Sequence, residues 1–314
     1  MLRLIRLTLR LHIKRTSFAL AAAAALFIGV MFGLGNTKKP SEDFMYSLDE
    51  TPFVLAGMIV SVITVWSVCT EFSDGTVRSK LITGVSKAQF ITAQIVASAV
   101  DAALVFLLTA APLILLGNKQ FYSLYSSEIL FIAFGLILLY LVFNGVLCAV
   151  ISCIIQSKVI ALILCAGMWF GLNFAATQLN GRLSEPQFSE RLITDIVQNK
   201  DTGKYEEHMS EVEYTPNSRR VSGAERETMK VLLLLTGKAG VYTAETILNT
   251  CTEAFTLDEY LSFAKETVND KLTWGSCYMF EGADGFAVYP LWTLGECAVF
   301  TAIGVLIFRK RNIY

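Results

Sequence analysis

Long apolar runs separated by short charged stretches dominate the pattern of this chain. A helix needs about 20 predominantly apolar residues to cross a hydrocarbon core about 30 Å thick. The apolar positions are continuous within each run rather than alternating, which excludes a transmembrane barrel. The pattern predicts an all-α polytopic membrane protein with six transmembrane helices, at residues 17–34, 53–69, 91–116, 130–155, 159–177 and 287–308.

The composition agrees with this architecture. Hydrophobic residues make up 54% of the chain and charged residues only 17%, a balance that would make a soluble domain of this length insoluble. The first run has the basic start and alanine-rich middle of a secretory signal peptide. Its apolar stretch is too long for a signal and further spans follow it, so we expect a retained membrane anchor.

The placement of basic residues predicts the orientation. Lys and Arg gather before the first run, between the second and third, between the fourth and fifth, and after the sixth. By the positive-inside rule, both termini face the cytoplasm. The predicted organisation is a cytoplasmic interfacial helix at 1–16, transmembrane helices 1–5 within 17–178, an extracellular insertion at 179–286, the sixth transmembrane helix at 287–308 and a cytoplasmic tail at 309–314.

The first residues have the pattern of an amphipathic helix. Arg3, Arg6, Arg10 and Lys14 are three or four residues apart and share one helical stripe, while Leu and Ile cover the rest. Such a helix lies in the membrane interface with its basic face toward anionic head groups. A basic orientation signal without fixed structure is the alternative.

The extracellular insertion is expected to be mainly helical. Helices are predicted at 188–198, 228–235, 243–255 and 260–268, with capping boxes formed by Ser222 with Glu225 and by Thr256 with Glu259. The polar stretch 199–222 is expected to be a loop, and no strand is predicted. Cys251 and Cys277 lie in this segment, where an oxidising environment permits a disulfide. Their separation in space, which decides whether the bond forms, is left open.

The loop at 71–87, between the second and third runs, has a pattern of its own. It is expected to form a short surface helix with a glycine at each end. Thr76 would cap this helix, and Arg78 and Lys80 would face water. The apolar side chains would face a groove or the bilayer, namely Val77, Leu81 and Ile82. A loop of this size suits a soluble partner.

This loop resembles the signature of ABC-2-type permeases, the membrane subunits of bacterial ABC exporters. The matching positions are Glu71, Gly75, Thr76, Arg78, Lys80, Leu81, Gly84, Ser86 and Lys87. The N-terminal helix is similar to the elbow helix of that family, and the basic end after Phe308 is similar to its C-terminus. The stretch 215–226 resembles permeases of Gram-positive peptide-resistance systems. The insertion of about a hundred residues departs from the compact family pattern.

The resemblance implies a function, a location and partners. The loop would be a coupling helix that seats in a separate ABC ATPase subunit, and a second permease copy or homologous permease would complete the pathway. The location would be the bacterial plasma membrane. Export of an antimicrobial peptide is implied by the 215–226 stretch, with another hydrophobic or cationic compound, or sodium, as alternatives.

Several kinds of catalytic motif are missing from the sequence. There is no Gly-x-x-x-x-Gly-Lys-Ser/Thr loop, and the nearest fragment begins at Gly237. Only His12 and His208 are present, without a His-Glu-x-x-His pattern, so a zinc protease is unsupported. We expect no enzyme activity, no metal and no cofactor of the chain's own, with ATP and Mg²⁺ bound by the partner and no nucleic-acid partner.

Asp101 and Glu296 each fall near the middle of a predicted span. An ionised side chain there costs at least ~2.5–3.5 kcal/mol on insertion scales. No Lys or Arg shares these span cores, so no ion-pair partner is expected. Either the acids line a transport route for a cationic substrate, or they join helices through neighbouring Ser and Thr hydroxyls.

Two other functional classes remain open. A membrane-bound ligand-binding or signalling protein would use the extracellular insertion to capture a ligand and would need no ATPase partner. An intramembrane enzyme would use Asp101 and Glu296 and would turn over without ATP.

Overall fold

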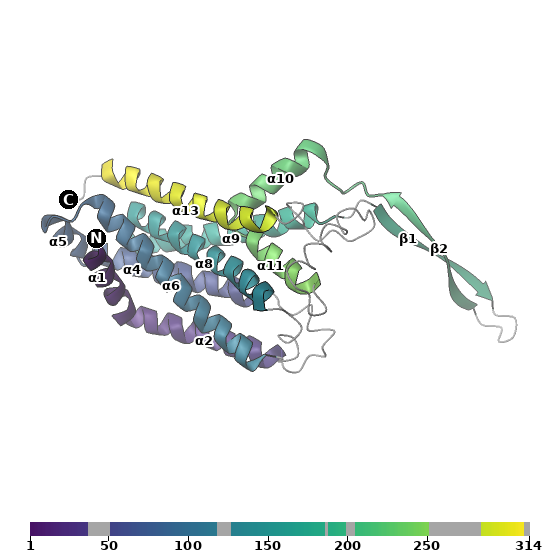
Figure 1. Ribbon diagram of the computed structural model, residues 1–314, viewed down its shortest axis with the longest axis horizontal. Coiled ribbons are helices and arrows are strands. Elements are labelled where there is room, and N and C mark those ends of the chain that lie inside the picture. The colour runs from purple at the N-terminus through teal and green to yellow at the C-terminus, as the bar shows by residue number, and fades with distance from the viewer. Residues whose placement is uncertain (37–50, 118–126, 186–187, 199–204, 251–283, 311–314) are drawn as a thin grey trace.

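The structure is a computed structural model that describes residues 1–36, 51–117, 127–185, 188–198, 205–250 and 284–310. Within this part, six helices are long and apolar enough to cross a membrane, as the sequence predicted. The chain is thus mainly helical, with the architecture of a multi-pass membrane protein (Figure 1). The six helices are α2 (Thr16–Asn36), α4 (Thr51–Ser73), α6 (Lys87–Leu116), α8 (Ser127–Ile155), α9 (Lys158–Leu183) and α13 (Asp284–Lys310).

Helix α8 is the central helix of the bundle. It packs against α4, α6, α9 and α13, and most of its membrane-spanning window is buried. Asn144 on α8 donates hydrogen bonds to the Gly57 carbonyl oxygen, at 2.7 Å, and to the Ser61 hydroxyl of α4, at 2.9 Å. Polar groups inside a bundle join helices in this way because lipid offers them no partner. By contrast, α2, α9 and α13 leave most of their apolar surface exposed.

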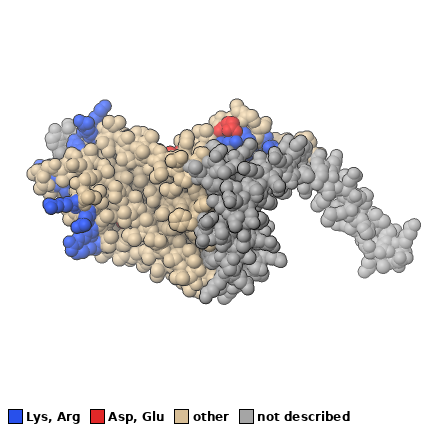
Figure 2. Space-filling view, viewed as in Figure 1, with Lys and Arg blue, Asp and Glu red and all other residues tan. Residues whose placement is uncertain are grey.

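Both chain ends lie at the same end of the bundle, together with α1 (Leu2–Lys14) and α5 (Thr76–Ile82) (Figure 1). We call this the basic end, because Lys and Arg side chains gather there (Figure 2). Helix α1 is present as predicted, and its four stripe residues, Arg3 to Lys14, are exposed. The backbone at Arg15 is extended, with φ −75° and ψ 143°, and separates α1 from α2.

Helices α2 and α6 approach closely through glycine. A Cβ added at Gly29 would collide with the carbonyl oxygen of Thr109, and one at Gly33 would lie 2.9 Å from the carbonyl oxygen of Pro112. Small residues at these positions allow the two backbones to touch, which is how dispersion contacts hold helices together in lipid.

A helical hairpin enters the bundle at the end opposite the chain ends. It consists of α10 (Gly223–Leu235) and α11 (Ala239–Thr250), and α11 packs against α8. In the turn, Gly237 adopts φ +70° and lies against the ring of Phe143, in the middle of α8. Lys238 follows with only 2% exposure, its ammonium 4.8 Å from the ring centroid of Tyr242. A basic side chain of the insertion is therefore buried among the helices.

Two of the helices predicted in the insertion correspond to observed helices. The helix at 228–235 lies within α10, but Ser222 makes no side-chain cap hydrogen bond, so the predicted capping box is not formed. The helix at 243–255 overlaps α11. The capping box at Thr256, the helix at 260–268 and the Cys251–Cys277 pair fall outside the described residues.

The predicted helix at 188–198 is wrong, and the predicted loop at 199–222 is wrong for residues 205–216. These residues form strand β1 (Phe188–Gln198), which pairs antiparallel with β2 (Tyr205–Pro216). The register joins Phe188 to Pro216 and Gln198 to Tyr205, with an irregularity after Ile193. The two strands project away from the helices (Figure 1), so the fold is not entirely helical.

The close approach of α2 and α6 is testable at Gly29. We expect Gly29→Ala to lower the free energy of unfolding in mixed detergent micelles by about 1–3 kcal/mol, because one added carbon overpacks the contact with Thr109. Gly35→Ala is the matched control, since a Cβ there meets nothing within 4 Å. Equal stability of the two variants would contradict the packing described.

Candidate functional site at the basic end

Helix α5 is a seven-residue helix held between two left-handed glycines. Gly75 has φ +70° and Gly84 has φ +92°, conformations that glycine adopts without steric cost. The glycine-bounded helix predicted from the sequence is confirmed. Gly75 rather than Thr76 occupies the N-cap, and the Thr76 hydroxyl instead donates to the carbonyl oxygen of Glu71 at 3.1 Å.

The next helix, α6, begins with a complete capping box. The Ser86 hydroxyl accepts from the backbone N–H of Gln89 at 3.2 Å, and the Gln89 side chain accepts from the Ser86 N–H at 3.0 Å. Two backbone donors that a helix start leaves unpaired are satisfied here. Ser86 of the family-like pattern therefore has a structural role in starting α6.

A buried ion pair ties α5 to α4. The Lys80 ammonium lies 2.6 Å from the Glu71 carboxylate, with side-chain exposures of 9% and 0%. The same ammonium lies 5.5 Å from the ring centroid of Phe90 on α6. The prediction that Lys80 faces water is wrong, because α5 folds back along the end of α4 and turns this side chain inward.

Apolar contacts seat the same face of α5. Val77 is buried in a cluster whose aromatic members come from three different helices. The ring centroids of Phe72, Phe90 and Phe308 are 5.8–6.0 Å apart in each pairing. Lys87, at the start of α6, donates to the carbonyl oxygen of Arg309 on α13 at 3.4 Å. Helices α4, α6 and α13 thus all meet beneath α5.

The opposite face of α5 is open to solvent. Arg78, Ser79 and Gly84 are exposed. Ile82 is 77% exposed, so the prediction that it shares the apolar face of Val77 and Leu81 is wrong. An apolar side chain beside a cation on an exposed helix is a composition suited to protein contact. Leu81 is only partly exposed and packs toward the cluster beneath.

A second buried pair joins α1 to α6. His12 Nδ1 lies 2.7 Å from a carboxylate oxygen of Asp101, and both side chains are fully buried. Nearby, the Arg15 guanidinium donates to the carbonyl oxygen of Ser67 on α4 at 2.5 Å. The partner of Asp101 is thus a histidine 89 positions away, which the sequence analysis did not identify. Whether Asp101 also lines a transport route stays a prediction.

Glu71, His12 and Asp101 of these two pairs belong to a set of buried polar residues that we call the polar seam. Its members on α4 are at positions i, i+3 and i+7, and those on α6 at i, i+4 and i+7, so each set shares one helix face. All of them are fully buried and carry at least one polar atom without a hydrogen-bond partner among the described residues. Ordered water commonly bridges such groups in proteins. The seam comprises Thr8 and His12 on α1, Thr64, Ser67 and Glu71 on α4, and Gln94, Ser98 and Asp101 on α6.

Glu296 lies apart from this end, on α13. It is 8% exposed and accepts a hydrogen bond from the indole N–H of Trp292 at 3.0 Å, one turn earlier on the same helix. Its second carboxylate oxygen is buried and has no partner among the described residues. Among the described residues, Glu296 and Asp101 bond to different partners, Trp292 and His12. A role for Glu296 in a pathway also stays a prediction.

Among the described residues, no group of three or more His, Cys, Asp or Glu side chains could hold a metal ion. The contacts at the basic end provide a mechanical connection between α5 and the spans. The exposed face of α5 is joined to the ends of three spans through the Glu71–Lys80 ion pair and the aromatic cluster beneath the helix.

The ion pair beneath α5 can be tested by removing one charge at a time. We expect Lys80→Met to lower the free energy of unfolding by about 3–5 kcal/mol, because it leaves a buried carboxylate unpaired. Adding Glu71→Leu should restore part of this loss. The control Arg78→Met, on the exposed face of α5, should stay within about 0.5 kcal/mol of the unmodified protein. Equal losses for the Lys80 and Arg78 variants would contradict the pairing.

The His12–Asp101 pair predicts how firmly α1 is attached. We expect His12→Leu to speed amide hydrogen exchange across residues 2–14, because the buried link to α6 is lost while a lone carboxylate remains. Adding Asp101→Leu should slow exchange again. Arg10→Leu, on the exposed stripe, serves as the control. Unchanged exchange in His12→Leu would show that the pair does not hold α1.

Comparison with known proteins does not place this chain in a family: no family model matches it, and neither does any curated protein.

Proposed function

We propose that this chain is the membrane-spanning permease subunit of an ABC exporter, worked by ATP hydrolysis on a separate subunit. The observation that supports this most is the construction of α5. One of its faces is exposed at the basic end, and the other is fixed to the ends of the spans through the Glu71–Lys80 pair. A short helix built in this way receives a push from a soluble partner and passes it into the membrane.

The contacts of α5 determine how its displacement would reach the spans. A displacement of α5 reaches α4 through the ion pair and through the Thr76 hydrogen bond to Glu71. It reaches α6 and α13 through the ring cluster of Phe72, Phe90 and Phe308. Because close-packed contacts of this kind resist compression, the three spans would tilt together rather than absorb the movement locally.

The polar seam supplies an interface that can rearrange. Its hydroxyl and amide groups on α4 and α6 have several donors and acceptors that no described residue satisfies, so alternative hydrogen bonds are available as the helices shift. An interface of interlocked apolar side chains would allow fewer arrangements. The seam thus fits spans that alternate between two packings.

A second permease copy, or a homologous permease, would complete the pathway. The helices α2, α9 and α13 present mostly apolar exposed surface, which is available for lipid and for a neighbouring permease. Asp101 and Glu296 are the acids that would favour a cationic substrate. Antimicrobial peptides, or another cationic or hydrophobic compound, are the proposed cargo.

A binding or signalling protein is the rival function, and the β-hairpin that projects from the helices is the feature that favours it. Such a protein would need no ATPase. The two functions therefore differ in a directly measurable partner.

The proposal predicts that α5 controls an ATPase. The chain would be co-expressed with an ABC ATPase, sought first in the neighbouring reading frame, then reconstituted and assayed for ATP hydrolysis. We expect Ile82→Asp to weaken the association of the two chains about thirtyfold, the effect of removing one apolar hot spot worth about 2 kcal/mol. Arg78→Glu should also reduce ATP hydrolysis by the pair.

The control is Arg10→Glu, which makes the same charge change at the same end of the molecule but on α1. It should leave association with the ATPase unchanged, and all three variants should keep the melting temperature of the unmodified chain. A chain that binds no ATPase, or an Ile82→Asp variant that binds it normally, would count against the exporter.

A further inference from the structure

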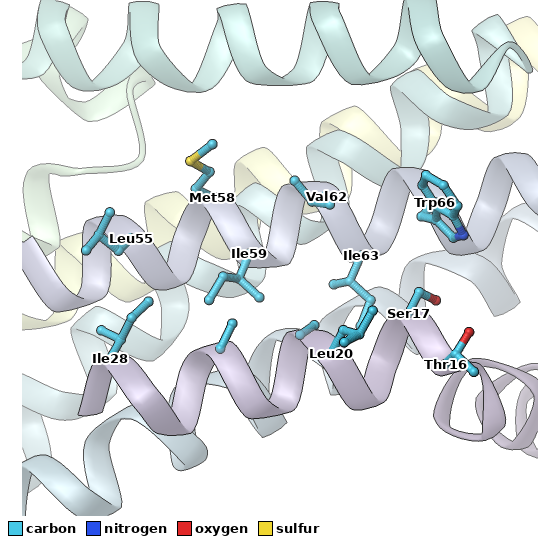
Figure 3. Close-up of a pocket in the computed structure, with 12 residues that line it drawn as sticks. Thr16, Ser17, Leu20, Ile28, Leu55, Met58, Ile59, Val62, Ile63 and Trp66 are labelled. Atoms are coloured by element: carbon cyan, nitrogen blue, oxygen red, sulfur yellow. The ribbon is translucent and has the colours of Figure 1, made fainter. Parts of the chain in front are cut away.

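A groove between α2 and α4 opens on the lipid-facing side of the bundle (Figure 3). It encloses about 520 Å³ and is lined almost entirely by apolar atoms, from Thr16 to Ile28 on α2 and from Leu55 to Trp66 on α4. An unfilled hollow on this surface would forfeit dispersion contacts along its whole length. An occupant from the membrane or from another protein is therefore required.

The two ends of the groove differ in chemistry. Toward Ile28 and Leu55 the lining is aliphatic. At the other end lie the hydroxyls of Thr16 and Ser17 and the indole of Trp66, whose nitrogen is on the side of the ring nearer these hydroxyls (Figure 3). The Ser17 oxygen is buried and has no partner among the described residues. The groove thus ends in hydrogen-bonding groups.

Cations surround this polar end. The Lys158 ammonium lies 5.5 Å from the ring centroid of Trp66, which is itself 48% exposed. Arg15 directly precedes Thr16 and is held in place by its bond to the Ser67 carbonyl oxygen of α4. An anionic group at this end would meet two positive charges and the hydroxyl of Ser17 together.

The length of the groove matches one leaflet of a bilayer. Twelve helical steps from Thr16 to Ile28 span about 18 Å at 1.5 Å per residue. Half of a hydrocarbon core about 30 Å thick is about 15 Å. The groove starts at the basic end, where α1 meets α2, so a chain lying in it would belong to the leaflet on that side.

We propose that this groove is a binding site for an anionic phospholipid, with one acyl chain between α2 and α4 and the phosphate at Arg15, Ser17 and Lys158. Anionic lipids are enriched in the cytoplasmic leaflet, the side on which the positive-inside rule puts the basic end. A helix of a second copy would fill the apolar length but would leave the cations and the Ser17 hydroxyl unmatched. The site does not depend on the exporter function.

The test is native mass spectrometry of the full chain released from micelles that contain equal amounts of phosphatidylglycerol and phosphatidylcholine. We expect one phosphatidylglycerol per chain to be retained in preference to phosphatidylcholine. Ala24→Trp should abolish retention, because it places an indole in the groove, while Ala23→Trp should not, because Ala23 is exposed on the same helix outside the groove.

A second pair of variants changes charge and leaves the shape of the groove intact. We expect Lys158→Gln to reduce the preference for phosphatidylglycerol about fivefold, the factor expected for one Lys near an anionic surface. Lys14→Gln, an exposed cation of α1, should change it little. Equal retention of the two lipids, equal loss in the Ala23 and Ala24 variants, or a lipid-free dimer as the released species would overturn the proposal.

Discussion

The ion pair between Glu71 and Lys80 connects the exposed part of the molecule to its membrane-spanning part. Its two charges lie where water is largely excluded, and this is costly unless they remain together. Separating α5 from α4 would leave each charge unpaired, so the short helix and the span move as one body. The aromatic cluster under Val77 extends this attachment to α6 and α13. A helix of seven residues would be marginal by itself, and here tertiary contacts hold it.

Helix α1 is attached by the same kind of contact, one buried His–Asp pair and one guanidinium bound to a carbonyl oxygen. The polar seam on α1, α4 and α6 includes residues of both attachments, and it carries buried polar atoms without a hydrogen-bond partner among the described residues. The molecule thus combines firm joints at α5 and α1 with an adaptable interface between the spans they control. That combination suits a protein that converts a push at one end into a tilt of helices.

The sequence was sufficient for features that depend on local composition. Continuous apolar runs predicted six spans, and Gly75 and Gly84 predicted the limits of α5, because left-handed backbone favours glycine. Contacts between distant residues were not accessible in this way. The side of α5 on which Lys80 lies depends on how α5 folds against α4. His12 meets Asp101 only because α1 packs against α6. Strand β1 was mistaken for a helix because Phe188, Leu192 and Ile196 are spaced at helical intervals, while the strand that pairs with it, β2, begins only at Tyr205.

The central claim is that α5 is the contact surface for an ATPase. Its most direct test is site-specific photocrosslinking in cells, with a photoreactive residue placed at Ile82 and, as a reference, at Ile13 on the exposed surface of α1. The account predicts a covalent adduct with a nucleotide-binding chain from position 82 and none from position 13. The yield of the adduct from position 82 should change when ATP is depleted. Absence of any ATPase adduct at position 82, in cells where crosslinking to another protein there succeeds, would contradict it.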